Sequence, residues 1–501
     1  MAGELLKLAA ARKLQKGHRY KKAEGLYEEF CAGFPFVPTP EQQRTFDEVE
    51  ADMYGAQAMD RLVVGDVGFG KTEVALRAAF IAAADGKQVA VIVPTTLLAR
   101  QHYQVFHERF KDFPFSIGHL SRMVNPKQAE DTRKRLAEGH VDIVIGTHAL
   151  LSKSVKFKKL GLMIVDEEQK FGVAHKERLK NLKANVDVLT LTATPIPRTL
   201  QMSMGGLKSL STITTPPVDR LAVRTYVVPF DIKVIREAIV REVSRNGQVF
   251  IVTPRVQGIE KLAERVRSIA PEAKVKVAHG QMGKEQLDSV MTEFYDGEFN
   301  VLVATTIIES GLDIARANTL IVHNSDRFGL GQLYQIRGRV GRSKTRSYAY
   351  FLLPETGGLS PDAEKRLRIL QRLEGLGMGF TLASYDLDIR GAGNLLGKEQ
   401  SGHIKEIGME LYSQMLAEAI EEIKSGGEDI SSDFEPFSPQ LSLGLTFMIP
   451  EDYVTDINTR MVLYRRLSHI TNAEDLDAFK DELVDRFGPL PAEVNLLLEV
   501  V

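Results

Sequence analysis

Cysteine is almost absent from this chain of 501 residues, which contains only Cys31. A single cysteine excludes an internal disulfide framework and favours the reducing cytoplasm as the location. No run of 18 apolar residues occurs, so no membrane-spanning helix is expected. The N-terminus lacks the apolar core of a secretory signal peptide, and the sequence has no internal repeat or low-complexity tract. These absences exclude disulfide-stabilised secreted proteins, integral membrane proteins and repeat proteins.

Net charge is also small, at −2, but the two parts of the chain differ in sign. Residues 405–501 contain seven Lys and Arg against 20 Asp and Glu, a net charge of −13. The remaining 57 basic and 46 acidic residues give residues 1–404 a net charge of +11. A basic body suits a polyanion, whereas an acidic tail would be repelled by one. Any nucleic-acid contact is therefore expected in residues 1–404, although solvated surfaces without such a role would give the same composition.

The bulk of the sequence has ordinary globular composition, with 44% hydrophobic residues and a length that suits about three domains. From residue 61, short apolar runs alternate with helical stretches, and the same rhythm repeats after a Thr-Thr-Pro-Pro break at 214–217. This alternation predicts an α/β fold with two parallel-sheet lobes and a cleft between them. Strands are expected at 62–64, 89–93, 141–145, 162–165 and 188–191, and again at 249–252, 275–278, 301–304, 320–322 and 348–353.

Changes in pattern divide the chain into six segments. The last segment, residues 441–501, ends in an uncapped apolar helical run, from which we expect a truncated C-terminal domain. The segments are a basic helical linker (1–33), the first lobe (34–213), the second lobe (214–353), a mostly helical segment interrupted by glycines (354–425), a polar linker (426–440) and an acidic α-rich unit (441–501).

A phosphate-binding loop follows the first expected strand, where residues 65–72 read Gly-Asp-Val-Gly-Phe-Gly-Lys-Thr. Glycines at 65, 68 and 70 (Gly65, Gly68, Gly70) let backbone N–H groups point at phosphate oxygens. Lys71 can reach the terminal phosphates, and the Thr72 hydroxyl can ligate Mg²⁺. A helix-prone stretch follows, as this loop requires, so ATP with Mg²⁺ is a much better explanation than an unrelated glycine-rich turn.

Two carboxylates and two arginines complete an ATP-hydrolysis site. Asp166 ends an expected strand and would hold Mg²⁺ directly or through water, while Glu167 would act as the general base on the attacking water. Segment 335–342 of the second lobe reads Gln-Ile-Arg-Gly-Arg-Val-Gly-Arg. Its Arg339 and Arg342 are expected to face the cleft and stabilise charge on the γ-phosphate when the lobes close. The alternative for these arginines is an exposed basic helix face.

Together these motifs resemble the motors of superfamily 2 helicases and translocases over both lobes, which implies two tandem RecA-like lobes. The resemblance implies that Gln42 reads the edge of adenine and that Phe34 or Phe36 stacks on its ring, although core packing explains either phenylalanine almost as well. It also implies a nucleic-acid track of loops that contact phosphates without reading bases. The residues assigned to this track are Thr95, Thr96, Thr147, Thr192, Thr194, His279, Thr305 and Thr306. Glu309, Gly311 and Asp313 would link the track to the nucleotide, with Asp313 on the nucleotide side.

Two further segments narrow the resemblance to double-strand translocases of the RecG and Mfd type. Residues 192–200 are similar to both groups, and residues 386–402 resemble their translocation motif, a helical hairpin and hook. Arg390 and Gln400 match the positions that connect the hook to the motor. Residues 450–488 resemble the regulatory domain of bacterial transcription-repair coupling factors (Mfd), which RecG lacks. The implied function is an ATP-dependent translocase on double-stranded DNA in transcription-coupled repair, acting as a monomer.

Three departures from that family limit how much of its function we expect in this chain. The sequence lacks the family's upstream parts, through which RNA polymerase and excision-repair proteins would be engaged. Gln169-Lys170 replaces a frequent His-Arg pair, and residues 251–255 lack the family's aromatic and acidic residues. A RecG-like fork-remodelling helicase is an alternative, but it needs a wedge domain that is not visible before residue 34. A non-enzymatic DNA-binding scaffold is disfavoured because the residues of the ATP site are intact.

Overall fold

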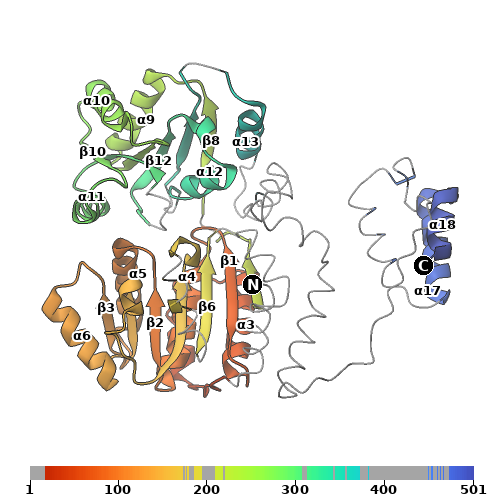
Figure 1. The fold of residues 1–501 in the computed structure, drawn as a ribbon, viewed down its shortest axis with the longest axis horizontal. Coiled ribbons are helices and arrows are strands. Elements are labelled where there is room, and N and C mark those ends of the chain that lie inside the picture. Colours follow the sequence, from red (N-terminus) through yellow and green to blue (C-terminus); the bar gives the residue numbers. More distant parts are fainter. Residues whose placement is uncertain are drawn as a thin grey trace. The chain divides into compact units, whose positions relative to one another are not determined.

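The computed structural model describes most of the first 372 residues and part of the C-terminal segment, and it divides the chain into two units, Met1–Asp429 and Ile430–Val501 (Figure 1). The described residues are 17–172, 175, 178–179, 186–193, 209–217, 220–306, 313–341, 345–355, 358–372, 382, 450, 453–454, 460, 463, 467 and 473–500.

The first lobe is built on a seven-stranded parallel sheet with the strand order β3-β4-β2-β5-β6-β1-β7. Parallel strands require long crossover connections, which the intervening helices supply. Because all the strands run the same way, the loops that follow them open at one edge of the sheet. The strands are β1 (Asp60–Gly65), β2 (Gln88–Ile92), β3 (Ile117–Leu120), β4 (Ile143–Gly146), β5 (Leu160–Asp166), β6 (Asp187–Thr192) and β7 (Ser209–Ile213).

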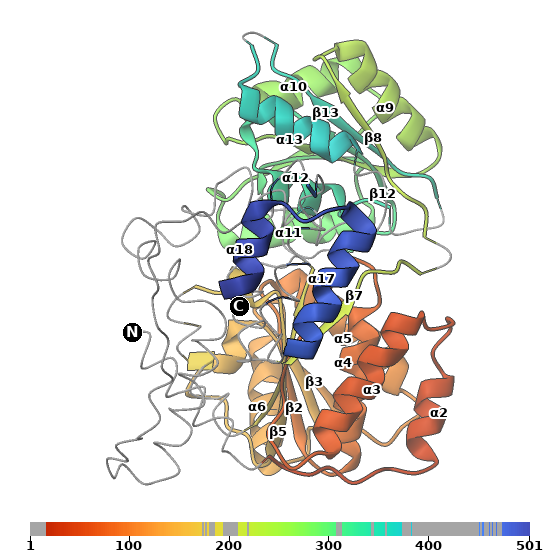
Figure 2. The ribbon, with the colours of Figure 1, turned by 90° about the vertical axis from the view of Figure 1, so that its right-hand side faces the viewer.

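Helices cover both faces of this sheet, with α6 on the opposite side from α3, α4 and α5 (Figure 2). The strand side chains alternate accordingly: Val89 and Val91 belong to one hydrophobic cluster, and Ala90 and Ile92 to the other. Such burial on both faces explains why the strands read as continuous apolar runs. The helices are α2 (Leu26–Ala32), α3 (Pro40–Tyr54), α4 (Lys71–Ala84), α5 (Thr96–Phe110) and α6 (Pro126–Glu138), with the 3-10 turns η1 (His148–Leu151) and η2 (Glu168–Lys170).

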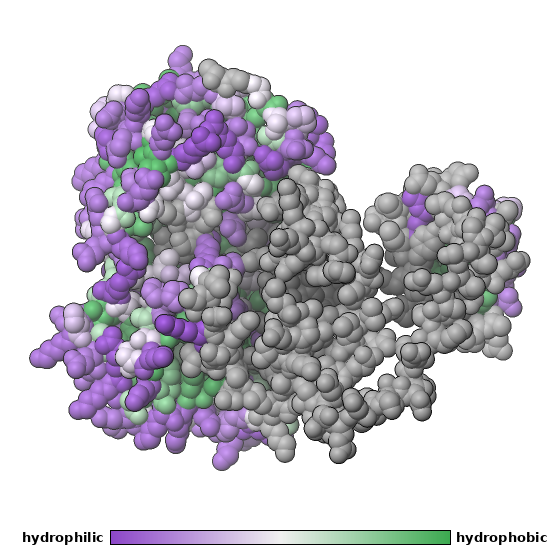
Figure 3. All heavy atoms as spheres, in the orientation of Figure 1, coloured by the Kyte–Doolittle hydropathy of each residue, from purple (hydrophilic) through white to green (hydrophobic). Residues whose placement is uncertain are grey.

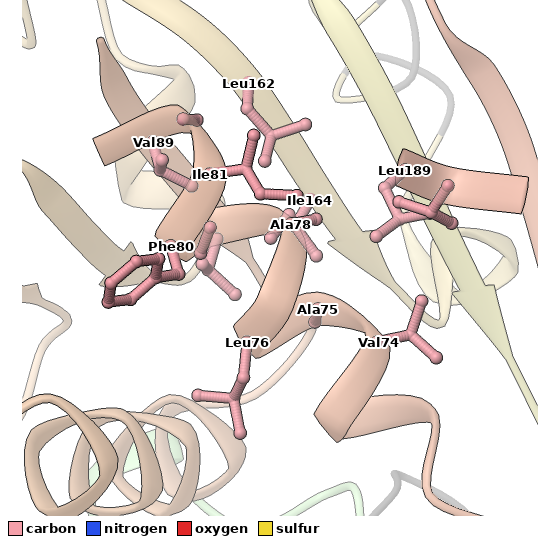
Figure 4. Packing of buried hydrophobic residues seen from close by; sticks show 14 of the residues in the cluster. Val74, Ala75, Leu76, Ala78, Phe80, Ile81, Val89, Leu162, Ile164 and Leu189 are labelled. Carbon is pink, nitrogen blue, oxygen red and sulfur yellow. The ribbon is translucent and has the colours of Figure 1, made fainter. Parts of the chain in front are cut away.

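Helix α4, which begins at the phosphate-binding loop, is buried along most of its length. Ala78 and Ile81 lie beside Leu162 and Ile164 of β5 (Figure 4). A helix that is apolar on nearly all sides belongs in a core, and its alanines allow close approach to the strands. This packing fixes the position of the phosphate-binding loop at the helix N-terminus.

The second lobe repeats the plan with a six-stranded parallel sheet in the order β10-β11-β9-β12-β13-β8. Its faces also carry separate clusters, one containing Phe250 and Leu302 and the other Val249 and Val301. The strands are β8 (Arg224–Val228), β9 (Gln248–Val252), β10 (Val275–Ala278), β11 (Val301–Ala304), β12 (Ala317–Val322) and β13 (Tyr348–Leu352). The helices are α9 (Ile232–Ser244), α10 (Ile259–Ile269), α11 (Lys284–Asp296), η4 (Ser325–Arg327), α12 (Leu330–Arg337) and α13 (Pro361–Arg372).

The C-terminal unit contains helices α17 (Ala473–Phe487) and α18 (Ala492–Val500). Phe479 and Leu483 of α17 pack with Val494 and Leu498 of α18 in a small core of their own. The hydroxyl of Tyr453 donates to the carbonyl oxygens of Leu483 (3.0 Å) and Gly488 (2.9 Å), which ties the preceding segment to the end of α17.

The predicted α/β class with two parallel-sheet lobes is confirmed, and all ten expected strands are present. The predicted hairpin and hook lie outside the described residues, and the domain boundaries stay predictions. Hydrophilic side chains cover most of the described surface visible in Figure 3. None of the helices in the described ranges is long and apolar enough to cross a membrane.

Candidate nucleotide and nucleic-acid site

The phosphate-binding loop connects β1 to α4 and contains two glycines in the left-handed region, Gly68 (φ 78°) and Gly70 (φ 82°). At Gly70, a Cβ atom would collide with the side-chain amide of Gln42, so glycine is required there for space as well as for backbone conformation. Gly65 approaches β7 closely, since a Cβ would lie 2.9 Å from the Ile213 carbonyl oxygen. The loop is therefore held tightly against its neighbours.

Lys71 and Thr72 occupy the first turn of α4, as the sequence predicts. The Lys71 ammonium donates to the carbonyl oxygens of Gly65 (2.5 Å) and Asp66 (2.9 Å), so it lies over the loop itself. Both Lys71 and Thr72 are partly exposed. A helix N-terminus with a nearby ammonium group is a favourable environment for phosphate.

Gln42 connects the segment before α3 to the phosphate-binding loop. Its Oε1 accepts from the backbone N–H of Thr39 (2.8 Å), and its Nε2 donates to the carbonyl oxygen of Phe69 (2.9 Å). An amide has a second acceptor lone pair and a second N–H, so each end retains the capacity for one more hydrogen bond. Adenine recognition by Gln42 stays a prediction, and the structure adds a second role in fixing the loop.

The two candidate stacking residues, Phe34 and Phe36, contact each other edge to face with ring centroids 5.5 Å apart. Phe36 is 59% exposed, whereas Phe34 is half-buried. The ring centroid of Phe34 lies 5.9 Å from the guanidinium carbon of Arg77. Arg77 is fixed by the buried carboxylate of Glu73 at 3.1 Å. Phe34 thus makes more contacts than Phe36, and both assignments stay predictions.

Asp166 ends β5, beside β6 and close to β1 in the sheet, which brings its carboxylate to the same edge as the phosphate-binding loop. Its Oδ2 lies 3.1 Å from Nε2 of His102 on α5. An ionised carboxylate only accepts hydrogen bonds, so Nε2 carries the proton in this pair. His102 is a neighbour of the site that the sequence did not identify.

Glu167 has a left-handed backbone (φ 54°), which is uncommon for a residue other than glycine and is often found at functional sites. Its side chain is 4% exposed. Oε1 accepts from the backbone N–H of Ala193 (3.1 Å), and Oε2 accepts from Nε2 of Gln169. The candidate general base is therefore oriented by the segment after β6, next to Thr192 of the predicted track.

The oxygen donors at this edge of the sheet are of the kind that binds Mg²⁺ together with a nucleotide. In the described ranges, no group of three or more His, Cys, Asp and Glu side chains could hold a metal ion by itself. Mg²⁺ commonly uses one or two protein oxygens together with substrate phosphates and water. The Thr72 hydroxyl and the Asp166 carboxylate, at the same sheet edge as the loop, fit that mode of binding.

Helix α12 of the second lobe contacts the phosphate-binding loop. The Tyr334 hydroxyl donates to Oδ2 of Asp66 at 2.5 Å, and burial together with Asp66 raises the Tyr334 pKa far above its ordinary value. A Cβ on Gly338 would lie 3.5 Å from the side chain of Val67. This contact brings the predicted arginine segment to the ATP site. Arg339 is 2% exposed rather than on an open helix face, and Arg342 lies outside the described residues.

Asp313 lies where the second lobe meets α5. Its backbone N–H donates to Oε1 of Gln101 (3.2 Å), and its carbonyl oxygen accepts from Nε2 of the same side chain (2.7 Å). The predicted contact of Asp313 with nucleotide stays a prediction, while Glu309 and Gly311 lie outside the described residues. Gln101 could not be identified from a sequence motif, because its partner is 212 residues away.

The residues of the predicted nucleic-acid track lie in loops after neighbouring strands. The sheet order places the loop at Thr95 and Thr96 (after β2) beside Thr147 (after β4), and His279 (after β10) beside Thr305 and Thr306 (after β11). Thr192 ends β6 and is buried, while Thr194 lies outside the described residues.

The loop after β2 already makes contacts of its own. Thr95 caps α5 by accepting from the N–H of Leu98 (3.2 Å), and Thr96 donates to Asp288 on α11 (2.9 Å). Thr147 Oγ1 and His279 Nδ1 are buried polar atoms with no hydrogen-bond partner among the described residues. Such atoms are suited to receive a ligand, since an unpaired buried polar atom is costly.

A hollow of about 890 Å³ lies between the lobes and is lined by Arg122 and Met123 from the first lobe and by α11 from the second. Lys284, at the start of α11, places a second cation in this hollow, whose lining also includes the carboxylates of Glu285, Asp288 and Glu293. Neither Arg122 nor Lys284 was identified from the sequence, because isolated basic residues have no spacing pattern. The hook residues Arg390 and Gln400 lie outside the described residues.

Comparison with known families supports the helicase-type architecture. Residues 39–203 match the DEAD/DEAH box helicase model, residues 231–344 the helicase conserved C-terminal domain, and residues 443–501 the TRCF domain. Over its whole length the chain is 50% identical to the transcription-repair-coupling factor of Escherichia coli (strain K12) and 51% identical to that of Bacillus subtilis (strain 168). It spans 44% and 42% of those relatives, respectively.

Solved structures show the same fold. RecG bound to a three-way DNA junction superimposes with a TM-score of 0.66 at 35% identity, covering 85% of this chain and 56% of RecG. Yeast Dbp5 bound to RNA and ADP BeF3 superimposes with a TM-score of 0.52 at 14% identity. The match covers 78% of this chain and 97% of the Dbp5 chain, and it supports the fold alone. The chain is therefore related along its full length to transcription-repair-coupling factors, and the resemblance predicted from its motifs is confirmed.

Proposed function

We propose that this chain is an ATP-driven motor that moves along double-stranded DNA. The observation that carries the proposal is the contact between Tyr334 of the second lobe and Asp66 of the phosphate-binding loop, at 2.5 Å. It joins a helicase-type second lobe to the nucleotide site, so that hydrolysis depends on how the lobes meet. The full-length relationship to transcription-repair-coupling factors supports DNA as the track.

In the proposed ATP site, Lys71 and the loop N–H groups bind the phosphates, and Glu167 accepts the proton of the attacking water. Thr72 and Asp166 would hold Mg²⁺, which neutralises phosphate charge when bound. Arg339 and Arg342 would stabilise the charge that develops on the γ-phosphate. Gln42 and Phe34 or Phe36 would bind the adenine base.

The proposed DNA track uses hydroxyls and N–H groups at strand ends. Thr147 Oγ1 and His279 Nδ1 would each gain a phosphate partner. Contacts of this kind are independent of base sequence. Arg390 and Gln400 of the predicted hook would convert lobe closure into movement.

The biological role that we propose is transcription-coupled DNA repair in the cytoplasm, with the chain working as a monomer. RNA polymerase and excision-repair proteins are proposed partners of proteins that contain this motor, reached through other segments. A RecG-like role on branched DNA is the second candidate, because the superimposed RecG structure contains a three-way DNA junction.

A duplex-stimulated ATPase assay combined with triplex displacement tests the proposal. Wild type should hydrolyse ATP faster with duplex DNA and should displace a triplex-forming strand. Lys71→Ala and Glu167→Gln should lower the stimulated rate by about 100-fold or more, because each removes a group that acts in the transition state.

Matched controls are Lys261→Ala and Glu264→Gln, which alter exposed residues of α10 and should leave both activities unchanged. Absence of DNA stimulation in the wild type would contradict the motor proposal. Normal hydrolysis by Glu167→Gln would remove that residue as the base. Reversal of a model fork by the wild type without triplex displacement would favour the RecG-like role.

A further inference from the structure

We propose that α5 mechanically links the candidate Mg²⁺ carboxylate to the second lobe. In this arrangement His102 is a positioning residue for Asp166, and the adjacent Gln101 attaches the same helix to the backbone at Asp313. The inference rests on the proposed ATPase function and adds two residues to it that the motifs do not contain.

His102 has the geometry of a group that orients a carboxylate. Its Nε2 lies 3.1 Å from Oδ2 of Asp166, and the side chain is 7% exposed. Nδ1 is buried and has no hydrogen-bond partner among the described residues, so Asp166 is the polar contact that this ring makes there. Burying an imidazole that makes one hydrogen bond costs free energy, because its other nitrogen is left without a partner. We therefore assign the hydrogen bond to Asp166 a function. Groups that hydrogen-bond to metal-ligating carboxylates fix their orientation and tune metal affinity.

Gln101 forms a two-point attachment across the lobes. Its amide donates to the Asp313 carbonyl oxygen at 2.7 Å and accepts from the Asp313 N–H at 3.2 Å. A backbone partner makes this contact independent of the side chain at position 313. Two simultaneous hydrogen bonds also fix direction, so α5 follows the position of this segment of the second lobe.

Other residues of α5 attach the same helix to α11 of the second lobe. Thr96 donates to Asp288 (2.9 Å), and Arg100 pairs with Asp296 (3.2 Å). Arg100 also lies 5.5 Å from the ring centroid of Tyr295. The contacts with the second lobe extend from the first turn of α5 past His102 to Gln104, whose Oε1 accepts from the Tyr295 hydroxyl (3.3 Å).

The consequence follows from helix stiffness. Gln101 and His102 are consecutive residues, separated by a rise of about 1.5 Å on one hydrogen-bonded helix. A shift of the second lobe therefore moves the part of the α5 backbone that carries His102. The Asp166 carboxylate adopts the orientation that ATP hydrolysis requires when the second lobe is attached to α5 through Gln101. A histidine that only fills the core would not respond to that attachment.

The first experiment measures the Mg²⁺ dependence of fluorescent ADP binding by the full chain, a readout independent of turnover. His102→Leu should raise the Mg²⁺ concentration at half-saturation by about tenfold. His102→Gln, whose amide N–H can reach the position of Nε2, should restore it to within about threefold, whereas the shorter His102→Asn should not. His107→Leu is the matched control, because His107 is an exposed histidine of the same helix that stacks on Tyr103.

The Gln and Asn variants keep the test decisive even if His102→Leu does not fold, since both replace the ring by an amide. Equal Mg²⁺ half-saturation in wild type, His102→Gln and His102→Asn would overturn the positioning role. If wild type itself shows no Mg²⁺-dependent nucleotide binding, the proposed ATPase function fails instead. The two failures are therefore distinguishable.

The second experiment tests the link to the second lobe. Gln101→Leu should lower the kcat of DNA-stimulated hydrolysis by about tenfold or more through misalignment, while Mg²⁺ half-saturation for ADP stays within about twofold. The double variant Gln101→Leu/His102→Asn should be slower than wild type by less than the product of the two single effects, because both substitutions act through one helix. Multiplicative effects, or an unchanged kcat in Gln101→Leu, would overturn the link.

Discussion

The polar groups around the phosphate-binding loop are held by partners that are distant in the sequence. Gln42 bonds to Phe69 across 27 positions, His102 to Asp166 across 64, and Tyr334 to Asp66 across 268. The loop itself follows from a local pattern, because its glycines and Lys71 are consecutive. The groups that orient it have no local spacing and depend on the finished fold.

Gly70 offers a residue-level prediction. Replacement by Ala should lower the free energy of unfolding of the first lobe by about 2–3 kcal/mol, because it adds left-handed strain and displaces the bonded amide of Gln42. Gly86→Ala is the control, since its φ is +71° but nothing lies within 4 Å of the added Cβ. It should cost only about 1 kcal/mol. Equal urea-unfolding midpoints for the two variants, with normal nucleotide binding by Gly70→Ala, would contradict the proposed contact.

At the scale of elements, the sequence located the central strands and one edge strand, β10, and missed the other three strands at the sheet edges. β3, β7 and β8 were not predicted, and each is an outermost strand of its sheet. An edge strand is partly exposed, so it contains residues such as His119, Ser209 and Arg224 in place of a continuous apolar run. Its existence depends on the neighbouring strand with which it pairs. The central strands are buried on both faces, and their composition alone identifies them.

The connection after β7 is fixed to α3 by Glu41. Its carboxylate accepts from the backbone N–H groups of Thr214 (2.6 Å) and Thr215 (2.7 Å) and from the Thr214 hydroxyl (2.8 Å). Partial burial acts to raise the pKa of Glu41, but these hydrogen bonds outweigh it and leave the pKa below its usual value. The break between the lobes is thus anchored to the first lobe by a charged acceptor.

A lowered carboxylate pKa gives a definite sign to the pH dependence. The stabilisation is fully present above the unfolded-state pKa of about 4.3 and is lost as pH falls through the lower folded-state pKa. Glu41→Gln should therefore destabilise the protein by about 1 kcal/mol at pH 7. The difference from wild type should disappear below about pH 4. Urea unfolding at pH 7 and at pH 3 checks this, and a difference that grows on acidification would contradict the assigned role.

For the whole molecule, the separation of charge is a property that no single element reveals. Residues 430–501 contain 5 basic and 13 acidic residues, a net charge of −8, and residues 1–429 have a net charge of +6. Asp477, Asp481 and Asp485 are exposed at four-residue spacing on α17, so part of this charge forms a stripe. A polyanionic track is attracted by the first unit and repelled by the second.

Removal of residues 430–501 should consequently raise the affinity for duplex DNA by about threefold or more at 50 mM salt. The gain should shrink towards zero near 0.5 M salt, where the Debye length falls to about 4 Å. The triple variant Asp477→Asn/Asp481→Asn/Asp485→Asn should reproduce part of the gain without deleting a folded unit. Fluorescence anisotropy across a salt series measures both effects. An affinity that does not change at low salt, in either variant, would show that the acidic unit does not act on DNA binding through its charge.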